Sequence, residues 1–303
     1  GCQGLVDSNN KLARFNSPTS NTSQNFQGKN LWRYIANNQE INVVSNARIQ
    51  NHIDWISTQP EYLESISKRA EPFLYLVVSE TEKQGVPIEI ALLPIVESDY
   101  YPFSYSHGTA TGLWQFIPST GRMYGLDADW WHEDRRDVLA STKAAIRYLK
   151  DLNKMFDGDW LLSIAAYNAG PGRVQRAIDK NLEQGKKIDY WSLDLPKETE
   201  KYVPKLLAIG SVLKNPELYN QKLTTIENKP FLEAVQLDTQ FDLALIAQWT
   251  DLSIKEIYSY NPGLKRWATP EALPYTILLP QDVVNQFNNK LSKQGNRTRI
   301  SWT

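Results

Sequence analysis

The 303-residue sequence contains one cysteine, Cys2, and three histidines. A single thiol cannot form a disulfide within the chain, and it is too isolated to begin a metal site. His52, His107 and His132 lie far apart and show no zinc spacing such as His-Glu-x-x-His. No apolar run approaches the length that a membrane-spanning helix needs. We therefore expect a chain with no disulfide, no metal, no cofactor and no membrane span in the visible sequence.

The charge is balanced, with 33 Lys and Arg against 34 Asp and Glu and a net charge of −1. Nucleic-acid binding depends on an excess of positive charge, so we expect no nucleic-acid partner. The Gly-x-Ser-x-Gly pattern of serine hydrolases is also absent. Aromatic residues, in contrast, are frequent, with ten Trp and fifteen Tyr. Flat amphipathic rings suit a sugar-binding surface, so this excess slightly favours a carbohydrate ligand.

Apolar residues recur at helical spacing through most of the chain and predict a mainly α (α+β) protein. In the N-terminal part, helices are expected around Leu31–Ile35 and Ile49–Ile56, and over 62–84 with Gly85 as the C-terminal cap. A helix over 88–98 is expected to kink at Pro94. Further helices are expected over 137–156 and 159–170, each with an Asp cap, and over a segment that holds Tyr202 and ends near Lys214. The segment 100–119 contains too much Pro and Gly for a long helix and is expected to form loops with a short hairpin. From Asn228 the pattern changes to β-α-α-β, with strands at 231–237 and 275–279.

Glu97 ends the apolar helix predicted over 88–98. A carboxyl at the rim of a buried helix holds its proton more strongly than one in water, and a general acid needs this property near neutral pH. No second carboxylate is evident, because Asp99 lies two residues away and points to another side of the helix. Four more acidic residues share a Trp-containing loop in which we expect a solvated surface: Asp127, Asp129, Glu133 and Asp134.

Four ordered segments give the sequence a family resemblance. They are Leu93-Pro-Ile-Val-Glu-Ser98, Gly112-Leu-Trp-Gln-Phe-Ile-Pro-Ser-Thr-Gly121, Asn153-Lys-Met-Phe-Asp-Gly-Asp-Trp-Leu-Leu162 and Glu198-Thr-Glu-Lys-Tyr-Val203, and the shorter Ala166-Tyr-Asn-Ala-Gly170 lies between the last two. Their sequence and spacing resemble the lytic transglycosylases with a goose-lysozyme-like (SLT) catalytic domain. The resemblance implies a lysozyme-like helical catalytic domain that acts on the glycan strands of peptidoglycan.

The resemblance also implies a set of site residues. Glu97 matches the sole acid/base of the family, which cleaves the β-1,4 bond between N-acetylmuramic acid and N-acetylglucosamine without water and leaves 1,6-anhydro-muramic acid ends. Tyr202 matches the phenol that positions this Glu. The remaining matches are substrate-binding residues: Ser106, Gln115, Tyr167 and Asn168.

Two alternatives stay open. A hydrolytic lysozyme would cut the same bond with water, although it normally needs a second carboxylate. A non-catalytic wall-binding lipoprotein would keep the fold and use the C-terminal segment to hold glycan, although it would not need Glu97, Gln115 and Tyr202.

The predicted organisation has four parts. Residues 1–28 form a polar flexible tether, 29–84 a helical extension on the core, 85–220 the catalytic domain, and 228–290 a module that resembles LysM but lacks its usual Gly-Asp-Thr-Leu opening. Gly1-Cys2 resembles the end of a bacterial lipoprotein signal, and Gln3 resembles the sorting position of outer-membrane lipoproteins. We therefore expect a monomer anchored by a lipid on Cys2 to the outer membrane of a Gram-negative bacterium, facing the periplasm. The family resemblance also implies that further LysM repeats can follow Thr303.

Overall fold

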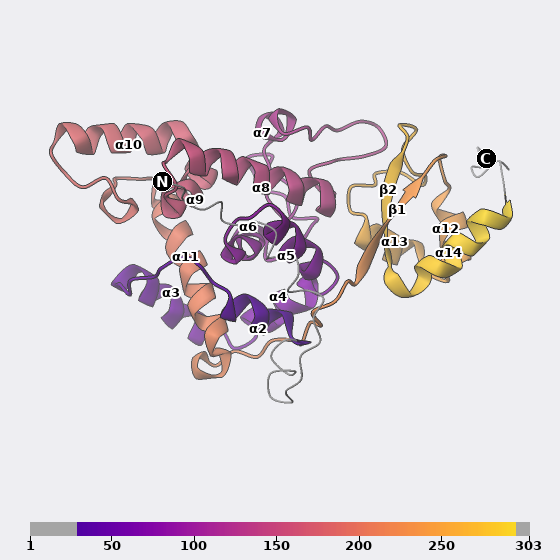
Figure 1. Ribbon diagram of the computed structural model, residues 1–303, viewed down its shortest axis with the longest axis horizontal. Helices are drawn as coiled ribbons and strands as arrows, with labels where there is room; N and C mark the ends of the chain where they lie inside the picture. The colour runs from indigo at the N-terminus through magenta and orange to yellow at the C-terminus, as the bar shows by residue number, and fades with distance from the viewer. Residues whose placement is uncertain (1–28, 295–303) are drawn as a thin grey trace, which may run out of the picture.

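The computed structural model describes residues 29–294, so the expectations for Cys2 and for the tether lie outside the described residues. Figure 1 shows a large helical body and, to its right, a smaller module with the only two labelled strands. The helical body contains α2 (Leu31–Asn37), α3 (Ala47–Ser57), α4 (Tyr62–Ala70), α5 (Leu74–Lys83), η3 (Ile88–Leu92), α6 (Leu93–Ser98), α7 (Pro118–Met123), α8 (Val138–Met155), α9 (Trp160–Ala169), α10 (Pro171–Glu183), η4 (Tyr190–Ser192), α11 (Lys197–Lys214) and η5 (Pro216–Tyr219). None of the helices within 29–294 is long and apolar enough to cross a bilayer.

The helical body is organised around α11, which contacts α2, α3, α6 and α9. Most of its length is buried, including the consecutive residues Leu206–Gly210. A helix that is apolar on nearly all sides belongs in the centre of a helical protein, because every face needs a partner. This central position brings the N-terminal end of α11, where Tyr202 lies, against the helix that carries Glu97.

The predicted helices at 31–35, 49–56, 137–156, 159–170 and 202–214 are confirmed as α2, α3, α8, α9 and α11. The caps also match. The Asp137 side chain accepts a hydrogen bond from the backbone N–H of Ala140, and Asp159 accepts one from Leu162. Gly85 follows α5 with φ +73°, the left-handed conformation expected of a C-terminal cap.

Two helices that were predicted to be continuous are each divided into two, in both cases because of a proline. The helix expected over 62–84 is interrupted at Pro72 and forms α4 and α5. The helix expected over 88–98 is a 3-10 helix followed by α6, and Pro94 lies in the first turn of α6. Proline lacks a backbone N–H and is tolerated in a first turn, so the chain starts a new helix instead of bending one. Three further helices, α7, α10 and α14, were not predicted.

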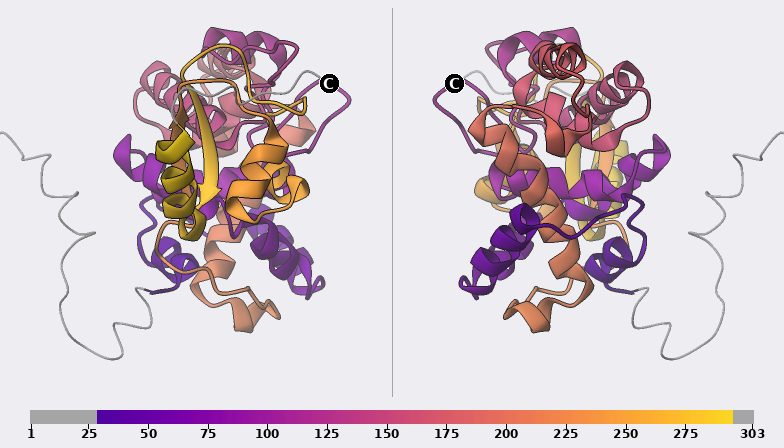
Figure 2. Two further views of the ribbon diagram at one scale, coloured as in Figure 1. Left: turned by 90° about the vertical axis from the view of Figure 1, so that its right-hand side faces the viewer. Right: turned by 90° about the vertical axis from the view of Figure 1, so that its left-hand side faces the viewer.

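The predicted β-α-α-β order of the C-terminal module is confirmed as β1 (Leu232–Leu237), α12 (Leu243–Thr250), α13 (Ile254–Tyr260) and β2 (Tyr275–Pro280), followed by α14 (Gln281–Gln294). The strands pair antiparallel, with Leu232 opposite Pro280 and Leu237 opposite Tyr275. Figure 2 shows the module end-on in its left view. A separate apolar cluster forms its interior, in which the rings of Phe241, Trp249 and Phe287 meet at 5.6–5.9 Å.

The module contacts the helical body through the docking loop, residues 127–136. His132 and Leu264 form an antiparallel bridge, and the Trp131 and Trp267 rings meet edge to face at 6.2 Å. The prediction of a solvated acidic surface is therefore wrong for Glu133, which is 9% exposed, whereas Asp127 and Asp129 are exposed as expected. Trp267 thus lies at the interface, whereas Trp249 lies inside the module.

Candidate active site

Glu97 lies in the last turn of α6, where the backbone leaves the helix abruptly. Asp99 and Tyr100 follow with φ values of 51° and 58°, in the left-handed region that non-glycine residues seldom adopt. The buried phenol of Tyr100 donates to the carbonyl of Ala91 at 2.7 Å and fixes this turn. Non-glycine residues in that region cost of order 1–3 kcal/mol each and persist only where the surroundings enforce them. The turn after Glu97 is thus held rigidly.

The neighbouring Ser98 anchors α6 to the following loop. Its buried hydroxyl bonds to the carbonyls of Pro94 at 3.0 Å and Leu113 at 2.8 Å. A hydroxyl engaged in this way is an anchor and is poorly placed to act as a nucleophile. This agrees with the absence of a serine-hydrolase pattern in the sequence.

The carboxyl of Glu97 is in an environment that favours its protonated form. Burial is the largest effect and raises its pKa to about 7, with a smaller contribution from the negative charge of Glu198. The hydrogen bond from Tyr202 and the positive charge of Lys205 act in the opposite direction. The residue keeps partial exposure, so another molecule can still reach it. A carboxyl with this pKa can both give and accept a proton near neutral pH.

Two tyrosines lie beside Glu97. The phenol of Tyr202 donates a 2.5 Å hydrogen bond to Oε1 of Glu97. Tyr167 donates to the carbonyl of Trp114 at 2.7 Å, and the charge of Glu97 contributes to raising the pKa of both phenols. Helices α6, α9 and α11 therefore bring together three predicted site residues that are separated by as many as 105 positions.

Gln115 lies in the site loop, residues 104–116. Its side-chain amide donates to the carbonyls of Ser104 at 3.1 Å and Gly112 at 2.9 Å, and its φ is +52°. The short bridges of 105 and 116 with Thr111 match the expected loop with a hairpin. Ser106 takes part through its backbone, which donates to Ala110 at 2.9 Å and accepts from Thr109 at 3.0 Å. The contact between the Ser106 hydroxyl and Glu97 stays a prediction.

Asn168 connects α9 with the start of α11. Its amide nitrogen donates to Oε1 of Glu198 at 3.1 Å, and its oxygen accepts from the Thr199 hydroxyl at 2.8 Å. Glu198 is exposed and acts electrostatically on Glu97. It is a second carboxylate at the site that the sequence analysis did not single out. Glu198 lies in the same sequence segment as Tyr202, and this position is the signal that could have identified it.

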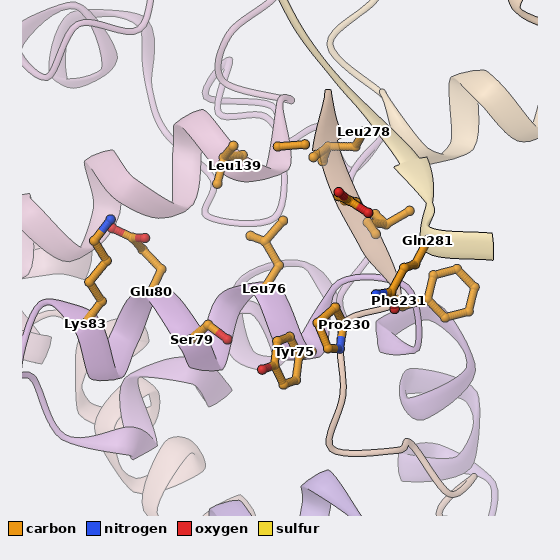
Figure 3. A pocket seen from close by; sticks show the side chains of 13 residues that line it. Tyr75, Leu76, Ser79, Glu80, Lys83, Leu139, Pro230, Phe231, Leu278 and Gln281 are labelled. Atoms are coloured by element: carbon orange, nitrogen blue, oxygen red, sulfur yellow. The ribbon is translucent and has the colours of Figure 1, made fainter. Parts of the chain in front are cut away.

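A separate groove lies between α5 and the module and does not include Glu97. Figure 3 shows Leu76 and Leu139 on the side of the helical body and Pro230, Phe231 and Leu278 on the side of the module. The lining is mainly apolar, and its charged members are Glu80, Lys83 and Glu233. Within residues 29–294, no group of three or more His, Cys, Asp or Glu side chains is arranged to hold a metal ion.

The sequence matches two family models. Residues 76–190 match the Transglycosylase SLT domain, and residues 231–296 match the Lytic transglycosylase MltD, LysM-like domain. Membrane-bound lytic murein transglycosylase D of Escherichia coli (strain K12) is 40% identical over 262 residues, which are 86% of this chain and 58% of that protein. A protein of Alteromonas sp. (strain M-1) named for tributyltin chloride resistance is 37% identical over 62% of this chain and 89% of its own length.

Among solved structures, the 70 kDa soluble lytic transglycosylase of Escherichia coli is similar over 61% of this chain and 30% of its own, with 20% identity and a TM-score of 0.40. This similarity is too low to carry an argument about the site.

These matches and the helical body define a mainly α, lysozyme-like protein with a LysM-like module, as the sequence predicted. The chain belongs to the family of lytic transglycosylases that carry an SLT domain, and its similarity extends to lytic murein transglycosylase D. It spans 58% of the length of that E. coli relative.

Proposed function

We propose that this protein cleaves the β-1,4 bond between N-acetylmuramic acid and N-acetylglucosamine in peptidoglycan without water, with Glu97 as its acid and base. The observation that carries this proposal is the Glu97 carboxyl, whose pKa is raised to about 7 by burial and which is bonded to Tyr202. The E. coli relative with 40% identity is named as a lytic murein transglycosylase, which agrees with this reaction.

The proposed reaction uses one carboxyl group twice, first as an acid and then as a base. Glu97 first gives its proton to the oxygen between the two sugars as the bond to C1 of the muramic acid breaks. The resulting carboxylate then takes the proton of the C6 hydroxyl of the same muramic acid as that oxygen attacks C1. The product is a 1,6-anhydro ring and Glu97 is protonated again. The attacking hydroxyl and C1 belong to the same sugar, so the effective concentration of the nucleophile is high. No second carboxylate is then needed to activate a water molecule.

The remaining predicted residues are proposed to bind the sugar strand. Tyr202 orients Glu97 through its 2.5 Å hydrogen bond. The support for this role is that Gln115 and Ser106 lie in the site loop and that Tyr167 on α9 is close enough to Glu97 to be affected by its charge. Asn168 already holds Glu198, so in our proposal the two act together on the substrate.

A hydrolytic lysozyme is the second candidate, and Glu198 is the observation that favours it. An exposed carboxylate held by Asn168 in the neighbourhood of Glu97 is the kind of group that can activate a water molecule. A lysozyme adds one water molecule across the cleaved bond, whereas the proposed reaction adds none. The mass of the products therefore distinguishes the two reactions.

Digestion of purified sacculi followed by mass spectrometry of the muropeptides tests the proposal. We expect anhydro-muropeptides, each lighter by one water than a lysozyme product, and loss of nearly all product with Glu97→Gln. Asp99→Asn is the matched control, because Asp99 lies two residues away and its carbonyl is held by Arg69. Reducing-end products that depend on Glu198 would favour hydrolysis, and binding without any product would favour a wall-binding protein.

We also propose a place for the protein in the cell. The E. coli relative is named as membrane-bound, and Gly1-Cys2-Gln3 resembles a lipidated N-terminus. A monomer carried on a lipid at Cys2, with the parts 1–28, 29–84, 85–220 and 228–290, would face peptidoglycan from the outer membrane. Mass spectrometry of the N-terminal peptide from detergent-extracted protein tests the lipid.

A further inference from the structure

Arg135 lies in the docking loop and reaches into the site loop. Its Nη1 donates to the carbonyls of Thr109 at 2.8 Å and Phe116 at 3.0 Å, so one guanidinium holds two points on the site loop. Its Nε donates to Glu133 at 2.8 Å. The two side chains are only 12% and 11% exposed, respectively. Removing one member of a pair this deeply buried leaves the other charge uncompensated, so the two residues must stay together.

The carbonyls of residues 113, 114 and 116 are each held by a different side chain. Ser98 donates to Leu113, and Tyr167 donates to Trp114. Arg135 donates to Phe116. The first two donors come from the helices beside Glu97, whereas the third comes from the docking loop. Gln115 lies between these fixed points, so its position depends on all three.

Gly112 shows how closely the two loops approach. Its φ is +88°, and a Cβ at this position would lie 2.1 Å from the carbonyl oxygen of Arg135. The site loop therefore packs directly on the backbone of Arg135 as well as on its side chain. A movement of the docking loop cannot leave the site loop in place.

The module holds the docking loop from the other side. The backbone N–H of Glu133 donates to the carbonyl of Gly263 at 2.8 Å, and that of Lys265 donates to Trp131 at 2.9 Å. Arg266 stacks on the Trp130 ring at 3.5 Å and donates to the Trp130 carbonyl at 3.1 Å. Glu133 is thus bound by the module through its backbone and by Arg135 through its carboxylate.

We propose that the C-terminal module sets the geometry of the active site, and that Arg135 is the positioning residue that transmits this effect. The module fixes the backbone of Glu133, Glu133 orients Arg135, and Arg135 holds both ends of the 109–116 turn. The site loop then presents Gln115 to the sugar strand. The part of this proposal that concerns sugar rests on the proposed function, whereas the coupling between module and site loop does not.

Hydrogen exchange measured by mass spectrometry tests the coupling without any substrate. We expect Arg135→Lys to increase exchange in the peptide that covers residues 104–116, because a single ammonium nitrogen cannot replace both Nε, which bonds Glu133, and Nη1, which bonds the two carbonyls. We expect the same increase from Gly263→Ala, since the added Cβ would lie 2.4 Å from Nε2 of the His132 ring and push the module away from the docking loop. Arg122→Lys on α7 and Lys255→Ala on α13 are the controls, because both residues are exposed.

Binding of a soluble peptidoglycan tetrasaccharide in a Glu97→Gln background tests the consequence for the site. We expect Arg135→Lys and Gly263→Ala each to raise Kd by up to about tenfold, the effect of losing one hydrogen bond between Gln115 and the sugar strand. The double variant is expected to be little weaker than either single variant, because both act through Glu133. In a protein with Glu97 intact, Arg135→Lys is expected to leave the pH dependence of catalysis unchanged, because the substitution does not alter Glu97.

Gly263→Ala keeps the test valid if Arg135→Lys fails to fold, because its site of change lies in the module. Unchanged exchange over residues 104–116 in Gly263→Ala, together with increased exchange at the docking loop, would overturn the coupling. Increased exchange over 104–116 with unchanged Kd for the tetrasaccharide would retain the coupling and instead contradict the proposed function of the site loop.

Discussion

The phenol of Tyr202 opposes the effect of burial on the pKa of Glu97. The hydrogen bond from Tyr202 stabilises the charged carboxylate and lowers its pKa, against the effect of burial. In the proposed reaction Glu97 must be protonated to act as the acid, so we expect activity to fall as the pH rises through about 7. Tyr202→Phe removes the donor, and the pKa of Glu97 rises further. We expect the alkaline limb of the pH–kcat profile to move up by about one pH unit.

Tyr124→Phe is the matched control for this change. Tyr124 also donates to a carboxylate, Oδ2 of Asp151 at 2.7 Å, but this pair does not involve Glu97. Its removal should leave the alkaline limb in place. A limb that stays fixed in Tyr202→Phe, or moves to lower pH, would show that the phenol does not control the acid.

Prediction of individual site residues from the sequence depended on short segments. Glu97, Tyr167 and Tyr202 lie in recognisable segments, and the structure brings them together. Arg135 was not predicted, because its importance arises from contacts with residues 19 and 26 positions away. No local pattern distinguishes such an arginine from a solvated one.

Helix α9, which carries Tyr167 and Asn168, begins with a side-chain cap. Asp159 begins α9 and accepts the backbone N–H of Leu162 at 3.1 Å, while Tyr167 and Asn168 lie at the other end of this helix. We expect Asp159→Ala to lower the free energy of unfolding by about 1 kcal/mol, because an N-terminal donor loses its acceptor. Urea unfolding monitored by circular dichroism measures this loss. Asp159→Asn keeps the acceptor and should retain most of the stability; an equal loss in both variants would refute the role of the cap.

Local signals explain which helices could be predicted. Asp caps and apolar spacing gave α8 and α9 nearly to the residue. Proline was harder to interpret, because Pro72 and Pro94 are each compatible with a kinked helix and with the end of one helix and the start of another. The packing of neighbouring helices decides between these outcomes. A kinked helix and two consecutive helices show the same sequence pattern around the proline.

The segment between the predicted catalytic domain and the predicted module packs with the helical body. Gln221 is 3% exposed and donates to the carbonyls of Ile56 and Gln59, and Ile226 belongs to the core of the helical body. The backbone of Asn228 then donates to the carbonyl of Lys29 at 2.9 Å. A truncation after Asn220 would therefore remove part of the catalytic core, and the module begins after Asn228.

A chain that ends at Asn228 is expected to fold with a lower melting temperature, because apolar surface covered by the module becomes exposed. Leu232 and Leu278 of the two strands pack into the main core and account for part of this surface. We expect the isolated module to pellet only weakly with sacculi, since in the whole chain its surface is engaged with the docking loop through Gly263 and Lys265. Calorimetry and pelleting of the truncated chain and of the isolated 229–303 fragment measure both effects. Strong pelleting of the isolated fragment would instead make the module a wall anchor in its own right.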